Sequence, residues 1–457
     1  MSRQAWSLVS ALVLLVAGCG DDAAPNMTSL GAAIPRQTTV WLGPEGLEED
    51  VALRLGNAGV DEVVVRRGRV DLTSGVPVLR LTNEAPLAAV VPVGVELSVE
   101  GLPAKLDPSA AESLWRALEG DLGGLTLAEL ILDLRQLHPA MGAFLSSLAE
   151  VSGASVVPVL TVEQLATAEG RDVARAAGTI IVPAYGSLEL YREGAAESAD
   201  PLPVRLAAIA DLGVRVRVGV VLMPQSIPQL GVWGDDLDLI CGQNVTEIST
   251  SSRLDRTFTF LVPMEWSGRS WKAKEQIALR WMDAARVNAA LAESSRMVLP
   301  ELAGWDLISM PPPSGALGLG QEALFAYLGG EGPAPRVELR ATRSGRAVSV
   351  QMVNTGPFPT AVSAYGNWLE VGVETGQIVV EDRGDFDRVI LGSRRGGEWR
   401  QASAGGSDAA RFVEDYVGSR EEMWTGPIRL PSAASVLVVR WSLVLSTGEE
   451  LTGMTRL

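Results

Sequence analysis

The sequence predicts an α/β protein built as a (β/α)8 TIM-like barrel followed by a C-terminal antiparallel β-sandwich. The main observation is the stretch 127–160, in which an apolar strand (128–134), an amphipathic helix starting at Pro139 and a second apolar strand (154–160) follow one another. The same alternation recurs on both sides of this unit. A second observation is a change of hydrophobic period, from helical spacing to two, after a glycine- and proline-rich linker at 329–335.

The elements before the central unit follow the same pattern. Short apolar runs predict strands at 38–42, 61–65 and 88–97. A helix beginning at Pro44 is expected between the first two strands. Asp107-Pro108 predicts the start of the next helix, because aspartate caps a helix and proline fits its first position.

The elements after the central unit complete the repeat. Thr161 and Gln164 have the spacing of a capping box. Further strands are expected at 179–182, 214–222 and 305–309, and further helices near 202–209 and 319–328. An insertion with a short antiparallel piece is expected between Pro224 and Trp271, followed by a long helix carrying Ile277, Trp281, Val287 and Leu291.

Eight strand–helix pairs over residues 38–329 match a (β/α)8 barrel in order and length. An open doubly wound sheet is the alternative, although it needs fewer strands. Residues 336–457 contain short alternating strands separated by glycine turns, which is typical of a β-sandwich. A helix around 409–417 is the one long helix considered there.

The N-terminus has the features of a bacterial lipoprotein. Arg3 precedes an apolar run that ends in Val-Ala-Gly-Cys19, so residues 1–18 are expected to be a lipoprotein signal peptide with lipidation at Cys19. An ordinary signal peptide is the alternative. Residues 19–37 then form a flexible tether. A lipid anchor predicts attachment to a membrane of the bacterial cell envelope.

Composition excludes several kinds of function. A net charge of −17 argues against nucleic acid and anionic membrane surfaces as partners. The single histidine, His138, and the single remaining thiol, Cys241, leave no ligand set for a thiolate metal cluster and disfavour most zinc sites. No dinucleotide fingerprint is present either. From these two observations together, neither a metal nor a cofactor is expected.

The order of these features is similar to that of an uncharacterised bacterial lipoprotein family with a glycoside-hydrolase-like barrel, a domain of unknown function of type 3142. The resemblance comprises the lipobox, a strand ending in Val40-Trp41-Leu42, a strand ending in Ile131-Leu132-Asp133-Leu134, a Pro183-Ala-Tyr185 loop and a terminal sandwich. It would cover residues 38–328. The resemblance supports the fold and leaves the activity open.

Candidate catalytic residues are the acids at the carboxyl ends of the barrel strands, where such barrels place their sites. Asp133 is the first candidate, because Leu132 and Leu134 on either side must face away from it. Glu96 or Glu163 would be its partner, since glycoside hydrolysis needs two carboxyl groups. The seventh strand ends without the acid that many barrel glycosidases carry. A structural role for Asp133, with Arg135 as its partner, is the favoured alternative.

Candidate ligand-binding residues are Trp41, Tyr185 and Arg135, which could offer stacking surfaces and a positive charge to a sugar. Trp233 and Trp266 are further aromatic candidates at loop positions. His138 precedes a helix and is expected to cap or pack it.

Two functions are therefore expected to compete. The first is an anchored envelope protein whose barrel binds a glycan or partner without efficient catalysis. The second is an active glycoside hydrolase that uses Asp133 with Glu96 or Glu163. A lesser third possibility is that the sandwich binds the ligand and the barrel acts as a spacer.

Overall fold

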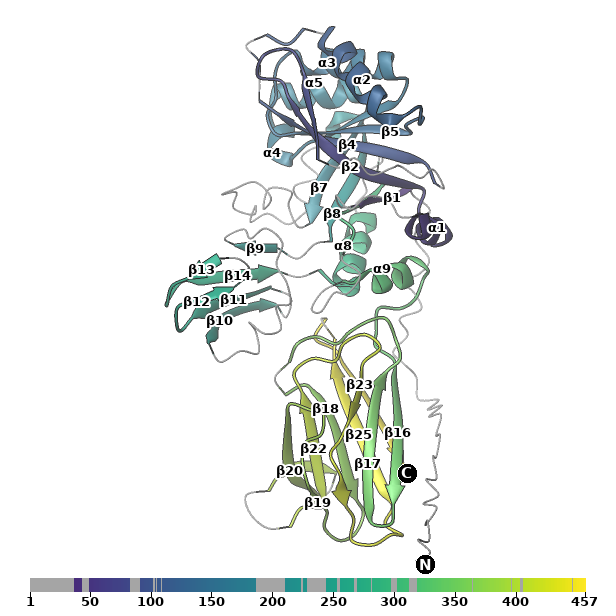
Figure 1. Ribbon diagram of the computed structural model, residues 1–457, viewed down its shortest axis with the longest axis vertical. Coiled ribbons are helices and arrows are strands. Elements are labelled where there is room, and N and C mark those ends of the chain that lie inside the picture. Colours follow the sequence, from purple (N-terminus) through teal and green to yellow (C-terminus); the bar gives the residue numbers. More distant parts are fainter. Residues whose placement is uncertain are drawn as a thin grey trace, which may run out of the picture.

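The computed structural model is shown in Figure 1. It describes residues 37–42, 49–82, 91–185 without 102, 104 and 108, 210–222, 225–227, 244–252, 255–266, 269–280, 282–296, 302–311, and 319–457 without 364, 396, 403–405 and 446. The predicted signal peptide, Cys19 and most of the tether lie outside these residues. Within the described residues, no helix is both long enough and apolar enough to span a membrane.

The first domain is a closed parallel barrel. Its strands follow the order β1-β15-β8-β7-β6-β5-β4-β2, and β1 also pairs with β2, which closes the ring. The predicted closed barrel is confirmed, and the open sheet is wrong. The strands are β1 (Gln37–Leu42), β2 (Glu62–Asp71), β4 (Val93–Glu100), β5 (Glu129–Leu134), β6 (Ser155–Val159), β7 (Thr179–Tyr185), β8 (Arg215–Val221) and β15 (Leu302–Ile308).

Helices cover the outside of the barrel, as Figure 1 shows for α2, α3 and α5. They are α1 (Glu49–Asn57), α2 (Ser109–Leu122), α3 (Met141–Ser152), α4 (Val162–Leu165), α5 (Ala168–Ala177), the short 3-10 helix η3 (Ala210–Leu212), α8 (Ala284–Arg296) and α9 (Gln321–Leu328). The capping box of Thr161 and Gln164 is present at α4. One large apolar cluster joins these helices to the outward side chains of the strands.

The second half of the barrel contains an insertion that the sequence indicated only in outline. Its four-stranded sheet has the order β10-β11-β14-β9, beside the two-stranded pair β12-β13, and it has its own apolar core. The strands are β9 (Gln225–Ile227), β10 (Val245–Ser252), β11 (Asp255–Phe260), β12 (Met264–Trp266), β13 (Arg269–Trp271) and β14 (Gln276–Arg280). Figure 1 shows this sheet extending away from the barrel strands.

Two predicted elements and one omission need correction. The long helix through Ile277 is wrong at its start, because Ile277 and Leu279 alternate into the insertion core as part of β14. The helix near 409–417 is also wrong, because this segment begins with strand β22 (Ala409–Glu414). The hairpin of β2 with β3 (Val78–Leu81) was not predicted.

The chain after the linker forms two antiparallel sheets. The five-stranded sheet contains β16 (Val337–Ser344), β17 (Ala347–Asn354), β19 (Val379–Val380), β23 (Glu422–Trp424) and β24 (Ile428–Arg429). The six-stranded sheet contains β18 (Asn367–Val373), β20 (Arg388–Arg395), β21 (Glu398–Gln401), β22, β25 (Leu437–Val444) and β26 (Glu450–Arg456). Buried side chains from both sheets belong to one hydrophobic cluster.

Candidate functional site

Strand β5 directs Asp133 into the barrel. Leu132 and Leu134 belong to the outer cluster beneath the helices, whereas Ile131 belongs to a separate cluster inside the ring. Because side chains alternate along a strand, Asp133 shares the inner face with Ile131. It lies near the carboxyl end of β5 and is only 4% exposed. The predicted orientation is confirmed, but the carboxyl group is buried beneath the rim.

Glu96, one of the two expected partners of Asp133, lies on the neighbouring strand β4. Ser98 on β4 stands opposite Asp133, and Glu96 stands opposite Ile131. Glu96 has no exposed surface; Arg66 Nε donates to its Oε2 at 2.9 Å, and Ser98 Oγ donates to its Oε1 at 3.1 Å. Burial raises the pKa of Glu96, and the nearby Asp133 raises it further, against the opposing charge of Arg66. Both oxygens of Glu96 are therefore engaged within the protein.

A second polar layer lies deeper in the barrel, toward the amino ends of β2, β5 and β8. Arg217, of which 1% of the side chain is exposed, donates to Asp306 at 2.7 and 2.8 Å and to Glu129 at 2.5 Å. Trp41 Nε1 also donates to Asp306, at 2.8 Å. Burial alone would lower the pKa of Arg217, but the two carboxylates outweigh it and raise that pKa, so the guanidinium stays charged.

Glu62 adds a third carboxyl group to this layer. Burial raises its pKa to about 8, and repulsion from Glu129 contributes in the same direction. Gln37 donates to Glu62 Oε2 at 3.1 Å, while the buried Glu62 Oε1 has no hydrogen-bond partner among the described residues. A neutral carboxylic acid at pH 7 suits this site, because a buried charge without full pairing is costly.

This deeper layer was not predicted, although the sequence contains a signal for it. Two arginines, Arg215 and Arg217, stand between valines in the run Val214–Val221, and a charged side chain inside a buried parallel strand needs an opposite charge. The partners of Arg217 could not be chosen from the sequence, because Asp306 and Glu129 come from distant strands.

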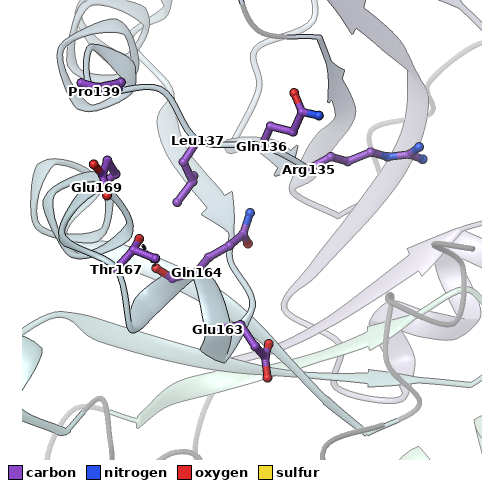
Figure 2. A pocket seen from close by; sticks show the side chains of 8 residues that line it. All are labelled: Arg135, Gln136, Leu137, Pro139, Glu163, Gln164, Thr167 and Glu169. Carbon is purple, nitrogen blue, oxygen red and sulfur yellow. Dashed lines mark hydrogen bonds between the residues drawn. The ribbon is translucent and has the colours of Figure 1, made fainter. Parts of the chain in front are cut away.

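A cavity of about 410 Å³ opens at the carboxyl ends of β5 and β6. Its wall on one side follows β5, and on the other side it follows α4 and the start of α5, as Figure 2 shows. The lining side chains are mostly polar, with two apolar members: Arg135, Gln136, Leu137, Pro139, Glu163, Gln164, Thr167 and Glu169. The cavity therefore lies at the face where barrels place their ligand sites.

Two of these lining residues hold the cavity wall in place. Gln164 closes the capping box with Thr161 and also donates to the Leu134 carbonyl at 2.8 Å, which ties α4 to the end of β5. Thr167 caps α5. In contrast, Gln136 is exposed and makes no hydrogen bond with any described residue, so its amide is available to a ligand.

The remaining predicted site residues do not gather around Asp133 and Glu96. Glu163 is exposed and lines the cavity, apart from the buried acids, whereas Arg135 pairs with Glu100 at 3.6 Å. The expectation that Trp41 offers an open stacking surface is wrong, because Trp41 is 2% exposed and bonds to Asp306 inside the barrel. Tyr185 ends β7, and its side chain lies outside the description, as does Trp233.

The minor predictions for this region can also be placed. His138 Nδ1 accepts from the Ala140 amide at 3.0 Å just before α3, whose N-cap residue is Ala140 and has no side-chain capping bond. Trp266 is half-buried against the insertion core. Within the described part of the chain, no group of three or more histidine, cysteine or acidic side chains is arranged to hold a metal ion.

Comparisons with known proteins give only distant likenesses. No family model and no curated protein matches the chain. Among solved structures, the chain is similar to the spore cortex-lytic enzyme SleL of Bacillus megaterium, with 11% identity over 60% of this chain and 70% of that one, and a TM-score of 0.38.

Two further structures come from a plant and from a second bacterium. The xylanase and α-amylase inhibitor protein XAIP-II from Scadoxus multiflorus is 11% identical over 60% of this chain and 92% of its own, with a TM-score of 0.35. A GH30 endoxylanase from Clostridium papyrosolvens is 10% identical over 86% of this chain and 96% of its own, with a TM-score of 0.28.

Proposed function

We propose that this protein is a lipid-anchored component of the bacterial cell envelope whose barrel binds a glycan at the rim cavity without efficient catalysis. The observation that carries the proposal is the state of the inner acid pair. Glu96 has both oxygens hydrogen-bonded and no exposed surface, and Asp133 is 4% exposed.

The inner acids are poorly placed for hydrolysis. A glycosidase needs one carboxyl group that can reach the glycosidic oxygen and a second that acts as nucleophile or base. Glu96 is instead held by Arg66 and Ser98, and the last residues of the seventh barrel strand, Val220 and Val221, are apolar. The acid pair is therefore best explained as part of the polar packing of the barrel interior.

The rim cavity supports ligand binding. Its volume of about 410 Å³ lies within the usual range for small-ligand sites, roughly 300–1,000 Å³. Gln136 supplies a donor and an acceptor, and Glu169 supplies acceptors, which are the groups that sugar hydroxyls need. Leu137 and Pro139 add an apolar surface for the carbon–hydrogen faces of a sugar ring.

Anchoring and the C-terminal module complete the proposal. The lipobox ending at Cys19 supports attachment by several acyl chains. The shared core of the two C-terminal sheets supports a β-sandwich, which would hold the barrel as a separate module on the envelope surface. The protein would then have the domain organisation of the uncharacterised bacterial lipoprotein family with a glycoside-hydrolase-like barrel.

The test is a glycan-array screen with the wild-type protein, followed by calorimetry on the best ligand. Gln136→Ala is expected to weaken binding about tenfold, which corresponds to roughly 1.4 kcal/mol. Glu150→Gln, an exposed change at the other end of α3, is the matched control and should leave the affinity unchanged. The proposal fails if no glycan binds, or if Gln136→Ala binds as the wild type does.

An active glycoside hydrolase is the second candidate, and one specific observation favours it. Glu96 and Asp133 are neighbours on adjacent strands, and burial raises the pKa of Glu96, as expected for the proton donor of such a pair. This reading requires Arg66 and Ser98 to release Glu96 when substrate binds. Turnover that depends on Asp133 would support it.

A further inference from the structure

The outer face of the six-stranded C-terminal sheet carries a cluster of arginine and tryptophan side chains. On β18, Leu369 and Val371 point into the shared core, so Trp368 and Glu370 lie on the opposite face. On β22, Phe412 points into the same core, which places Arg411 beside them on that outer face. We call this surface the Arg411 face.

Glu370 organises the arginines of the Arg411 face. It has no exposed surface and accepts from Arg394 at 2.5 and 3.1 Å, from Arg411 at 3.0 Å and from Arg440 at 3.3 Å. One carboxylate thus faces three guanidinium groups, and an excess of two positive charges remains. This local excess stands out in a chain whose net charge is −17.

The guanidinium of Arg411 lies over two aromatic rings. Its guanidinium carbon lies 4.0 Å from the ring centre of Trp368 and 4.4 Å from that of Trp399, both of which are partly exposed. Because Nε is bound to Glu370, the orientation of the group is fixed. Among the described residues, nothing accepts from Nη1 or Nη2 of Arg411, and neither atom is a buried unpaired group.

The two Nη groups of Arg411, which no described residue engages, form a fork that suits a carboxylate. A planar guanidinium binds a carboxylate through two parallel hydrogen bonds, and a fork that is already oriented loses little entropy on binding. Arg440 uses Nη1 toward Glu370, and its other nitrogens have no partner in the described part of the chain. The tryptophan rings beside the fork supply the stacking surface that pyranose rings use.

We propose that the Arg411 face is a second binding site, for a carboxylate-bearing polysaccharide. The sugar carboxylate would take this fork of Arg411, with Arg440 adding a second positive charge, and adjacent rings would stack on Trp368 and Trp399. The positive excess attracts the polyanion, and the rings give preference for sugars over other anions. The site is independent of the barrel rim, so it can hold or fail separately from the function proposed above.

The test is calorimetry of the purified soluble chain, without its lipid, against polygalacturonate oligosaccharides. The matched ligand control is the same material with methyl-esterified carboxyl groups, which keeps the rings and removes the charge. We expect polygalacturonate to bind and the ester to bind at least tenfold more weakly. Arg411→Lys keeps a charge but removes the planar fork, and should also lose at least tenfold.

Two variants and a vesicle assay complete the experiment. Arg440 makes only one contact with Glu370, so Arg440→Gln disturbs the cluster less and serves as the second variant if Arg411→Lys does not fold. It should lower the affinity a few-fold. Arg400→Gln, an exposed change on β21 beside Trp399 that points to the other side, should bind as the wild type does. The proposal is overturned if polygalacturonate does not bind, if the ester binds equally, or if only vesicles of phosphatidylglycerol and phosphatidylcholine bind.

Discussion

The barrel and the C-terminal sheets both bury an ion cluster, but with opposite balance. In the barrel, three carboxyl groups from Glu62, Glu129 and Asp306 surround the one guanidinium of Arg217. In the six-stranded sheet, one carboxylate, Glu370, is surrounded by three arginines. The first cluster is short of positive charge and the second has an excess.

This difference sets the protonation of each cluster. Burial raises the pKa of Glu62 to about 8 and also raises that of Glu129, so the acid-rich cluster retains a proton at pH 7. Burial alone would raise the pKa of Glu370, but hydrogen bonds from Arg394 and Arg411 outweigh it and lower that pKa. The barrel cluster is closed and protonatable. The sheet cluster is charged, and its Arg411 and Arg440 have donors that no described residue engages.

The largest expected effect comes from removing the one cation of the barrel cluster. Arg217→Met leaves the buried Asp306 without its opposite charge and Glu129 with only the exposed Arg215 nearby, which should lower the free energy of unfolding by about 4 kcal/mol. Urea denaturation followed by tryptophan fluorescence measures the loss. A loss below 1 kcal/mol would mean that the cluster is not charged as described.

A smaller effect is expected from the sheet cluster. Glu370→Gln removes the one carboxylate from three arginines, but these side chains are 20–28% exposed and can rehydrate. The free energy of unfolding should therefore fall by about 2 kcal/mol. An equal or larger loss than that of Arg217→Met would contradict the contrast between the two clusters.

Glu62 should make the stability of the fold depend on pH. An acid whose pKa is higher in the folded state stabilises the fold at low pH and loses this contribution as pH rises. For Glu62 the loss should run from pH 4.5 to about 8, at roughly 1 kcal/mol per pH unit. Glu62→Gln stays neutral at every pH, so thermal melts of this variant should show a flatter slope than the wild type over that window.

Glu370 should contribute with the opposite sign. Its lowered pKa means that its stabilisation is present above pH 4.5 and is lost as pH falls below that value. Melts of Glu370→Gln below pH 4.5 should therefore approach those of the wild type. A difference that grows on acidification would contradict this assignment.

The smallest effect should come from a surface pair. Arg175 and Asp172 on α5 are 53% and 74% exposed and lie 3.1 Å apart. Arg175→Gln should change the free energy of unfolding by less than about 0.5 kcal/mol, because water screens such pairs. This variant is the control for arginine removal in the Arg217 experiment.

The sequence predicted the barrel well because each strand is a short apolar run followed by a one-sided helix. It failed at Ile277, which lies in strand β14, although Val287 lies in helix α8 as predicted. Trp281, the third member of the predicted stripe, lies outside the described residues. Local periodicity cannot separate two short elements that happen to continue one spacing.

The candidate site was predicted in part for the same reason. Alternation around Asp133 correctly gave its inward direction, and strand order brought Glu96 beside it. Burial of both acids depends on how far they lie below the rim. The hydrogen bond from Trp41 to Asp306 joins β1 and β15, the first and last strands of the barrel. Such depth and long-range pairing arise only when the ring closes.

The most direct test of the central claim is a turnover assay on the glycan that the barrel binds. Wild type, Asp133→Asn and Glu96→Gln would be incubated with that glycan, and new reducing ends would be measured against a known glycosidase. We expect no release above background from any of the three, with binding by wild type and Asp133→Asn alike. Release by the wild type that Asp133→Asn abolishes would contradict a binding protein and establish a hydrolase.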